Sequence, residues 1–149
     1  MLSKQPAIVG AIADLDTLSA LPELSQTIAL CDFIELRIDA LLARESLLCE
    51  CISNLTIPQV ITVRDPAEGG MNALSEFLPH ASVLDVEIRN LETFQAVAAE
   101  AQCQNVTVLG SFHDFQATPS HGDLLATVDR GRQAGADAIK IAVTLRDAD

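Results

Sequence analysis

The sequence predicts an α/β fold built from parallel strands, and two observations carry this prediction. Six short apolar segments rich in β-branched residues recur along the 149 residues, and segments of helical character separate most of them. A strand followed by a helix, repeated along a chain, indicates parallel strands joined by right-handed crossovers. We therefore expect one domain over residues 1–149, with a sheet covered by helices.

The predicted strands are the six segments of strand length in which aliphatic side chains predominate. They are AIVGAIA (7–13), FIELRI (33–38), QVITVR (59–64), VLDVEI (83–88), VTVLGSF (106–112) and AIKIAVT (138–144). Aromatic residues make up only 3% of the chain, so aliphatic residues must fill the core, as in a helix-covered parallel sheet.

The predicted helices lie between these strands. They cover residues 18–30, 44–53, 91–102 and 124–134. In the third of them, apolar residues recur at steps of three and four, which places them on one buried helical face. These residues are Leu91, Phe94, Val97, Ala98 and Ala101. The connection DPAEGGMNALSEFLPH (65–80) contains two glycines and two prolines and is predicted to be more loop-like.

Two architectures suit this alternation, an open doubly wound sheet and a closed (β/α)₈ barrel of the TIM type. No glycine-rich phosphate-binding loop follows the first strand, which counts against a nucleotide-binding doubly wound sheet. Six strands are too few for a complete barrel. The alternation alone leaves both architectures open.

Composition restricts the partners of the chain. Its formal net charge of −12 opposes binding to nucleic acids and to anionic membrane surfaces. No apolar run approaches the length of a membrane span, and the N-terminus lacks the pattern of a secretory signal. We expect a cytoplasmic protein that acts on a small molecule and binds neither nucleic acid nor membrane.

Cysteine usage points to unmodified thiols. Cys31, Cys49, Cys51 and Cys103 form no CxxC motif and have no histidine at metal-binding spacing. We predict buried, reduced thiols rather than a zinc site or a disulfide framework.

Charged residues alternate with apolar ones in the second predicted strand. Glu35, Arg37 and Asp39 share one face, and the apolar residues between them share the other. A half-exposed strand would also show this pattern. Three charges on one face of a buried sheet are costly unless they are paired, so we favour a functional site on that face.

Charged residues also mark the third and fourth predicted strands. Arg64 ends the third strand and Glu68 follows in the loop TVRDPAEGG, where a plain salt bridge between the two is the simplest interpretation. Asp85 and Glu87 share one face of the fourth strand. Their role could be structural pairing with Arg37 or Arg64.

Lys140 and His113 are the most informative residues. Lys140 projects between Ala138 and Ala142 on one face of the sixth predicted strand, where an unpaired charge would be costly to bury. A partly buried lysine can present a neutral amine, which is a nucleophile toward carbonyl groups. His113 follows the fifth strand, and alone it would be read as a hydrogen-bonded core histidine. Parallel α/β sheets place their sites at the carboxyl ends of the strands, where both residues are expected.

Several of these segments together resemble a known family. IELRID, ITVRDPAEGG, LDVEI, SFHDFQATP and ADAIKIA resemble, in order and spacing, the motifs of the type I 3-dehydroquinate dehydratases of the shikimate pathway, which are (β/α)₈ barrels. The matching pieces are spread over almost the whole chain. The resemblance implies a TIM-type barrel fold of which this chain carries about six βα units. Another imine-forming barrel enzyme, such as an aldolase, is the weaker alternative because of SFHDFQATP and TVRDPAEGG.

The resemblance implies dehydration of 3-dehydroquinate to 3-dehydroshikimate through a covalent imine. Lys140 would match the lysine that condenses with the substrate ketone, and His113 the general acid and base. Glu68 would match the carboxylate that orients this histidine. The substrate-binding residues would be Glu35, Arg37 and Arg64. Neither a metal ion nor an organic cofactor is needed, because the imine itself is the electron sink.

The family's barrel continues for two βα units beyond the lysine strand, and their loops carry residues that bind the substrate carboxylate. This chain ends at Asp149. We therefore expect unpaired strand edges at 7–13 and 138–144, which a homodimer could cover. The alternative to an active enzyme is a catalytically impaired, shortened relative that serves as a folded or oligomerising module.

Overall fold

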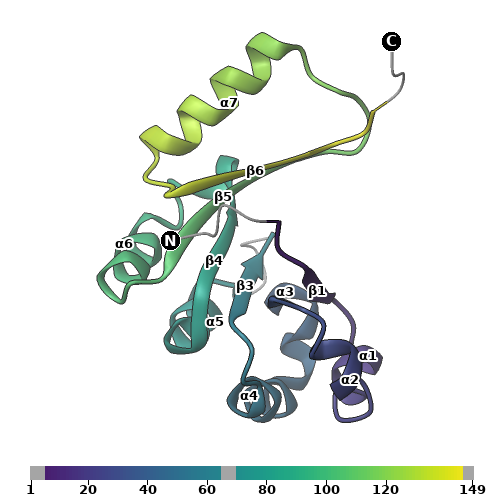
Figure 1. The fold of residues 1–149 in the computed structure, drawn as a ribbon. Coiled ribbons are helices and arrows are strands. Elements are labelled where there is room, and N and C mark those ends of the chain that lie inside the picture. The colour runs from purple at the N-terminus through teal and green to yellow at the C-terminus, as the bar shows by residue number, and fades with distance from the viewer. Residues whose placement is uncertain (1–5, 65–69, 146–149) are drawn as a thin grey trace.

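The structure is a computed structural model that describes residues 6–64 and 70–145. It contains one sheet of six parallel strands, in the order β1-β2-β3-β4-β5-β6. These are β1 (Val9–Ile12), β2 (Phe33–Arg37), β3 (Gln59–Val63), β4 (Ala81–Glu87), β5 (Thr107–Asp114) and β6 (Ala138–Val143). All six predicted strands are confirmed. The sheet curls from β1 to β6, with the helices on its outer side (Figure 1).

The strand order decides between the two architectures. A doubly wound sheet reverses its strand order at a switch point, whereas here every strand pairs with the next one along the chain. Sequential parallel pairing together with the curl is the arrangement of a (β/α)₈ barrel, of which these six strands form a curled part. Strands β1 and β6 are the two edges of the described sheet, as expected.

Seven α-helices and three 3₁₀ turns connect the described strands. The helices are α1 (Leu15–Ser19), α2 (Ser25–Ile28), α3 (Ile38–Leu41), α4 (Glu45–Asn54), α5 (Gly70–Phe77), α6 (Gln95–Cys103) and α7 (His121–Gln133). The turns are η1 (Leu42–Arg44), η2 (Leu78–His80) and η3 (Ile88–Asn90). None of the described helices combines the length and the apolar character needed to cross a membrane.

Three expectations about these connections were wrong. Residues 70–77 form helix α5 instead of a loop, because Leu74, Phe77 and Leu78 recur at helical spacing and are buried. The expected helix 18–30 is two short helices, α1 and α2, with Pro22 between them. Strand β2 was expected to reach Ile38, with Asp39 on its charged face. It ends at Arg37 instead, and residues 38–41 form α3.

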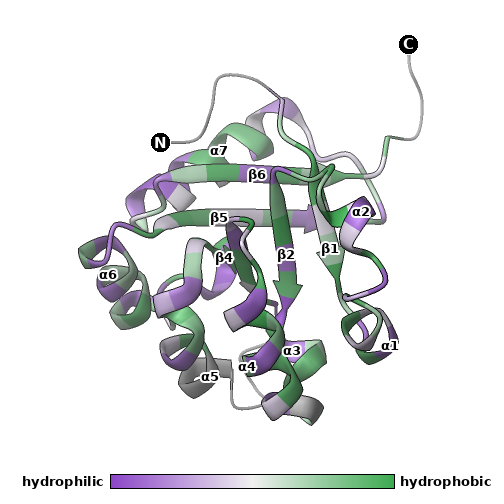
Figure 2. Ribbon diagram, turned by 60° about the horizontal axis from the view of Figure 1, so that its bottom comes forward, coloured by the Kyte–Doolittle hydropathy of each residue, from purple (hydrophilic) through white to green (hydrophobic). Residues whose placement is uncertain are grey.

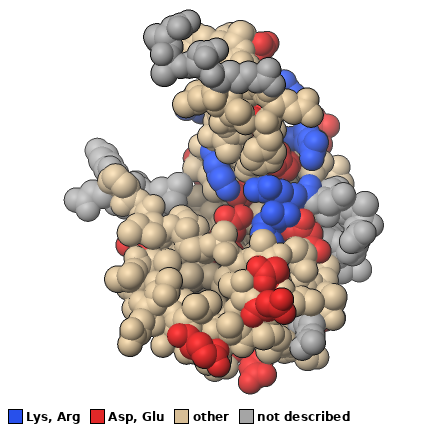
Figure 3. Space-filling view, turned by 90° about the vertical axis from the view of Figure 1, so that its right-hand side faces the viewer, with Lys and Arg blue, Asp and Glu red and all other residues tan. Residues whose placement is uncertain are grey.

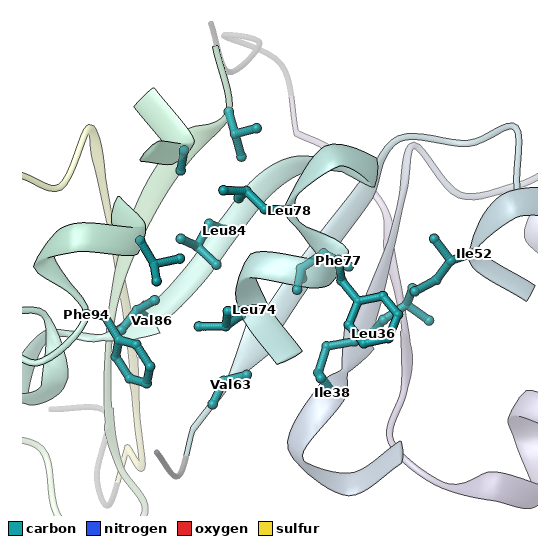
Figure 4. Packing of buried hydrophobic residues seen from close by; sticks show 14 of the residues in the cluster. Leu36, Ile38, Ile52, Val63, Leu74, Phe77, Leu78, Leu84, Val86 and Phe94 are labelled. Atoms are coloured by element: carbon teal, nitrogen blue, oxygen red, sulfur yellow. The ribbon is translucent and has the colours of Figure 1, made fainter. Parts of the chain in front are cut away.

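Alternation along the strands separates an apolar face from a polar one. On the outer, convex face, side chains such as Leu36, Leu84 and Val86 pack under the helices, together with Phe77 and Phe94 (Figure 4). Figure 2 shows that β5 is hydrophobic near its beginning and hydrophilic at its carboxyl end. There β5 extends beyond its predicted end at residue 112 and includes His113 and Asp114, which pair with β6.

The cysteines lie on the helical side of the sheet. All four thiols are free, as predicted, but the expectation that they are buried was wrong, because Cys103 is exposed and the other three are half-buried. Desolvation raises the pKa of the Cys49 and Cys51 thiols, which keeps them protonated and weakly nucleophilic near neutral pH. Cys31 and Cys51 line a cavity of about 610 Å³ between α1, α2 and α4.

Candidate active site

Polar side chains occupy neighbouring positions on the concave face of the sheet. The parallel register places Arg37 of β2 beside Thr62 of β3, and Thr62 beside Asp85 of β4. Residues in register on adjacent parallel strands project to the same side of a sheet, so these three form one row. Thr62 and Asp85 are buried, so their polar groups must be satisfied by protein contacts.

A second row lies one pleat nearer the carboxyl ends of the strands. Glu87 of β4 is in register with Ser111 of β5, and Ser111 with Lys140 of β6. Glu87 and Ser111 are buried, whereas the Lys140 side chain is 35% exposed. The row therefore runs from the interior of the sheet to its β6 edge.

Lys140 is held between two carboxylates. Its Nζ lies 3.1 Å from Oδ2 of Asp85 and 4.0 Å from Oε2 of Glu35. Glu35 is fixed in turn by Thr62, whose hydroxyl donates to Oε1 at 3.0 Å. Oδ1 of Asp85 is buried and has no hydrogen-bond partner among the described residues. The lysine amine is thus anchored on its inner side and partly open to solvent.

His113 is bound at both ring nitrogens. Its Nδ1 lies 2.5 Å from Oε1 of Glu87, and the two side chains are each 8% exposed. Its Nε2 lies 3.3 Å from an Nη of Arg64. A carboxylate only accepts hydrogen bonds and a guanidinium only donates them. Neutral His113 therefore carries its proton on Nδ1 and turns the lone pair of Nε2 toward Arg64.

Two local contacts place the arginines. Arg37 donates to both carboxylate oxygens of Asp39, with distances of 3.1 and 2.8 Å, although Asp39 belongs to α3 and not to a strand. This hydrogen bonding raises the pKa of Arg37, so its charge is permanent. Asn90 donates from Nδ2 to the backbone carbonyl of Arg64 at 3.1 Å, which fixes the residue that directly follows β3.

The structure brings together Lys140, Glu35, Arg64 and His113 on the concave face, with Arg37 in the adjacent row. Glu68 lies outside the described residues. The pairing considered for the acidic residues of β4 was wrong, because Asp85 and Glu87 contact Lys140 and His113 instead of the arginines.

Sequence reasoning missed the supporting polar residues of the site, which are Thr62, Ser111 and Asn90. The alternation that placed Asp85 and Glu87 on one face applies equally to Thr62 and Ser111. Threonine and serine also occur on strands without a functional role, so their residue type alone does not indicate a site. Asn90 lies in η3, which follows β4, and no periodicity in the sequence indicates toward which residue its side chain points there.

Positive and negative side chains lie together on this face, within a chain that is acidic as a whole. Figure 3 shows Lys and Arg side chains gathered on the face that lies on the right of Figure 1, with Asp and Glu side chains beside them. An amine, an imidazole and two guanidinium groups near one another suit a small anionic or polyhydroxylated substrate with a carbonyl group. Within the described residues, no group of three or more His, Cys, Asp or Glu side chains has the arrangement of a metal site.

Comparison with known proteins gives one consistent result. Residues 12–149 match the family model described as type I 3-dehydroquinase. The 3-dehydroquinate dehydratase of Thermodesulfovibrio yellowstonii is 31% identical over 99% of this chain. The 3-dehydroquinate dehydratase of Klebsiella pneumoniae subsp. pneumoniae is 33% identical over 58% of it.

Solved structures agree with these relatives. A type I 3-dehydroquinate dehydratase from Clostridium difficile, solved with covalently modified comenic acid, superposes with a TM-score of 0.80 over 97% of this chain at 26% identity. The 3-dehydroquinate dehydratase of Enterococcus faecalis superposes with a TM-score of 0.77 at 25% identity. This chain spans 68% of the Thermodesulfovibrio protein and 65% of the Clostridium structure, which is about two thirds of their length.

Proposed function

This chain belongs to the type I 3-dehydroquinase family, and we propose that it dehydrates 3-dehydroquinate to 3-dehydroshikimate through an imine on Lys140. The observation that best supports the proposal is the separate fixation of Lys140 and His113. Asp85 and Glu35 hold the amine, while Glu87 and Arg64 hold the imidazole. A nucleophile and a general base with independent partners can act on one substrate in successive steps.

The first step of the proposed reaction joins the substrate to the protein. The Lys140 amine attacks the C3 ketone of 3-dehydroquinate, and loss of water from the adduct gives the imine. The protonated imine withdraws electrons from C2 and makes its hydrogen acidic. The partial exposure of Lys140 leaves its outer side accessible to a substrate carbonyl.

The second step is the elimination. His113 takes the proton from C2, and the electron pair of that bond moves toward the imine nitrogen. The C1 hydroxyl then leaves as water, with the proton that His113 returns. Hydrolysis of the product imine restores the Lys140 amine and releases 3-dehydroshikimate. The electron sink is the imine, so this reaction uses no organic cofactor.

Binding of the substrate is assigned to Glu35, Arg37 and Arg64. Guanidinium groups donate to hydroxyl and carboxylate oxygens, and a carboxylate accepts from hydroxyl groups. Arg64 is within hydrogen-bonding distance of His113, so an oxygen of the substrate bound by Arg64 would lie near the base. Glu68 stays a prediction as a further carboxylate near the histidine.

The proposal also covers the cellular compartment, the class of substrate and the oligomeric state. We place the protein in the cytoplasm, with a small-molecule substrate of the shikimate pathway. A homodimer remains the expected way to cover the edges of β1 and β6, since paired edges are protected from nonspecific pairing.

The decisive test traps the imine. The protein is incubated with 3-dehydroquinate and borohydride, and its peptides are weighed by mass spectrometry. The sequence contains two lysines, Lys4 and Lys140, so the peptide with Lys4 is an internal control. We expect a mass increase on the Lys140 peptide only, and none in a Lys140→Met variant. A folded wild-type sample without the adduct would contradict the proposal.

His113→Ala separates the two steps. Loss of a general base typically slows a reaction by about 10²–10⁴-fold. We expect that slowing in the dehydration rate, with much less effect on borohydride trapping at Lys140. Equal dehydration rates in the variant and the wild type would remove His113 from its assigned role.

A further inference from the structure

We propose that Glu87 is the positioning residue of His113 and that it fixes the tautomer whose Nε2 accepts the substrate proton. This inference rests on the proposed function and deepens it. The sequence assigned the orienting role to Glu68, whereas the described contact to the imidazole comes from Glu87, at the carboxyl end of β4.

The first support is the directionality of the two contacts to His113. The 2.5 Å contact to Glu87 requires a proton on Nδ1, because the carboxylate can only accept. The Arg64 contact requires a lone pair on Nε2, because the guanidinium can only donate. Both partners therefore select the same tautomer. When Arg64 turns to the substrate, the free lone pair of Nε2 is the atom that takes the C2 proton.

The second support is the rigidity of the pair. Glu87 pairs with Ser111 in the β4–β5 ladder, and His113 pairs with Ala142 in the β5–β6 ladder, so both backbones are held in the sheet. Both side chains are 92% buried. A carboxylate at this depth has little access to water and depends on the imidazole N–H as its partner.

Asp85 gives a matched comparison. It lies two residues before Glu87 on the same strand and face, it is buried, and it contacts Lys140 instead of His113. The two carboxylates of β4 thus serve different groups. Replacing each in turn separates the orientation of the base from the orientation of the nucleophile.

The test reads the tautomer directly, by ¹⁵N NMR of the histidine rings in the substrate-free protein. The sequence has three histidines, and a His113→Gln variant assigns the His113 signals. We expect the Nδ1–H tautomer in the wild type, a smaller fraction of it in Glu87→Met, where only Arg64 still favours it, and no change in Asp85→Asn. An Nε2–H tautomer in the wild type would overturn the proposal even if the Glu87 variant did not fold. So would an unchanged tautomer in Glu87→Met, or an equal change in Asp85→Asn.

Kinetics then test the positioning role. Glu87→Met should slow dehydration by roughly tenfold or more while borohydride trapping at Lys140 changes little, since the base and not the nucleophile is misoriented. Equal slowing of both steps, or of neither, would overturn that role. Glu92→Met, at an exposed position, controls for the substitution itself. If the wild type forms no imine, the proposed function fails, whereas the tautomer measurement uses no substrate and still decides the contact of Glu87.

Discussion

The two faces of the sheet are made by alternate residues of the same strands, yet they bury different groups. The convex face buries aliphatic side chains against the helices, as Leu84 and Val86 do on β4. The concave face buries Asp85 and Glu87 from the same strand. Burial of apolar area stabilises the fold, whereas buried charge is tolerated only with partners. We infer that the convex face stabilises the fold, and that the buried charges of the concave face lower its stability but form the reactive site.

The largest effect on the free energy of unfolding is expected from a substitution on the convex face. Leu84 is fully buried, so Leu84→Ala should lower the free energy of unfolding by about 2–5 kcal/mol through lost transfer energy and a cavity. Thr62→Val on the concave face keeps its volume and loses the hydrogen bond to Glu35, which should cost only about 1 kcal/mol. Urea unfolding of both variants measures the difference.

The rate of imine formation should respond to the two substitutions in the opposite order. At a temperature where both variants are folded, Leu84→Ala should trap the Lys140 imine nearly as well as the wild type. Thr62→Val should trap it more slowly, because Glu35 loses the donor that fixes it beside Lys140. The division between the faces would be refuted if Thr62→Val were the more destabilised of the two and trapped at the wild-type rate.

A smaller effect is expected from the ion pair between Lys140 and Asp85. Lys140→Met leaves the Asp85 carboxylate, 1% exposed, without its cation. Removing one partner of a buried pair typically costs about 3–5 kcal/mol, and the exposure of Lys140 should reduce this to about 1–3 kcal/mol. Asp85→Asn combined with Lys140→Met should recover most of the loss, because no uncompensated charge stays buried.

A double-mutant cycle in urea measures this coupling. The third corner of the cycle, Asp85→Asn alone, leaves Lys140 with Glu35 and solvent and should be the milder single variant. Additive losses in the double variant would show that the two side chains do not stabilise each other. In that case the concave face would cost less stability than the comparison of the two faces implies.

Periodicity in the sequence was enough to predict the six strands and both faces of the sheet. The period of two separates Leu84 from Asp85, and position alone placed Lys140 and His113 at neighbouring strands. It did not predict which acid meets which base, because that depends on register between strands. Asp85 reaches Lys140 from a strand two positions away in the sheet, and no local pattern encodes this distance.

The connections were harder to predict because several local signals compete there. The glycines and prolines in residues 65–80 favour a loop, yet burial of Leu74 and Phe77 against the convex face stabilises helix α5. Similarly, Asp39 was placed on a strand that ends two residues earlier, although its contact with Arg37 is made from α3. Tertiary packing overrides local propensity at both places.

The smallest expected effect concerns Asp14, a carboxylate just beyond β1 that belongs to neither face. It caps α1, where its side chain accepts hydrogen bonds from the Thr17 backbone N–H and hydroxyl, each at 2.8 Å. These hydrogen bonds lower the pKa of Asp14. A carboxyl whose pKa is lower in the folded state stabilises the fold above its unfolded pKa of about 3.9, and this contribution disappears as the pH falls through the folded value.

Asp14→Asn keeps a side-chain acceptor for the cap and removes the charge. The difference in unfolding free energy between wild type and variant should therefore be largest near neutral pH and should shrink below about pH 4. Thr17→Val removes one of the two hydrogen bonds without changing the charge and should weaken the same pH dependence. Urea unfolding between neutral pH and about pH 3 measures it. A constant difference across that range would mean that the carboxylate charge does not act through the cap. A shrinking difference would show that a charged residue at a strand end can serve helix stability alone, so the functional face is identified by the contacts between strands and not by charge at their ends.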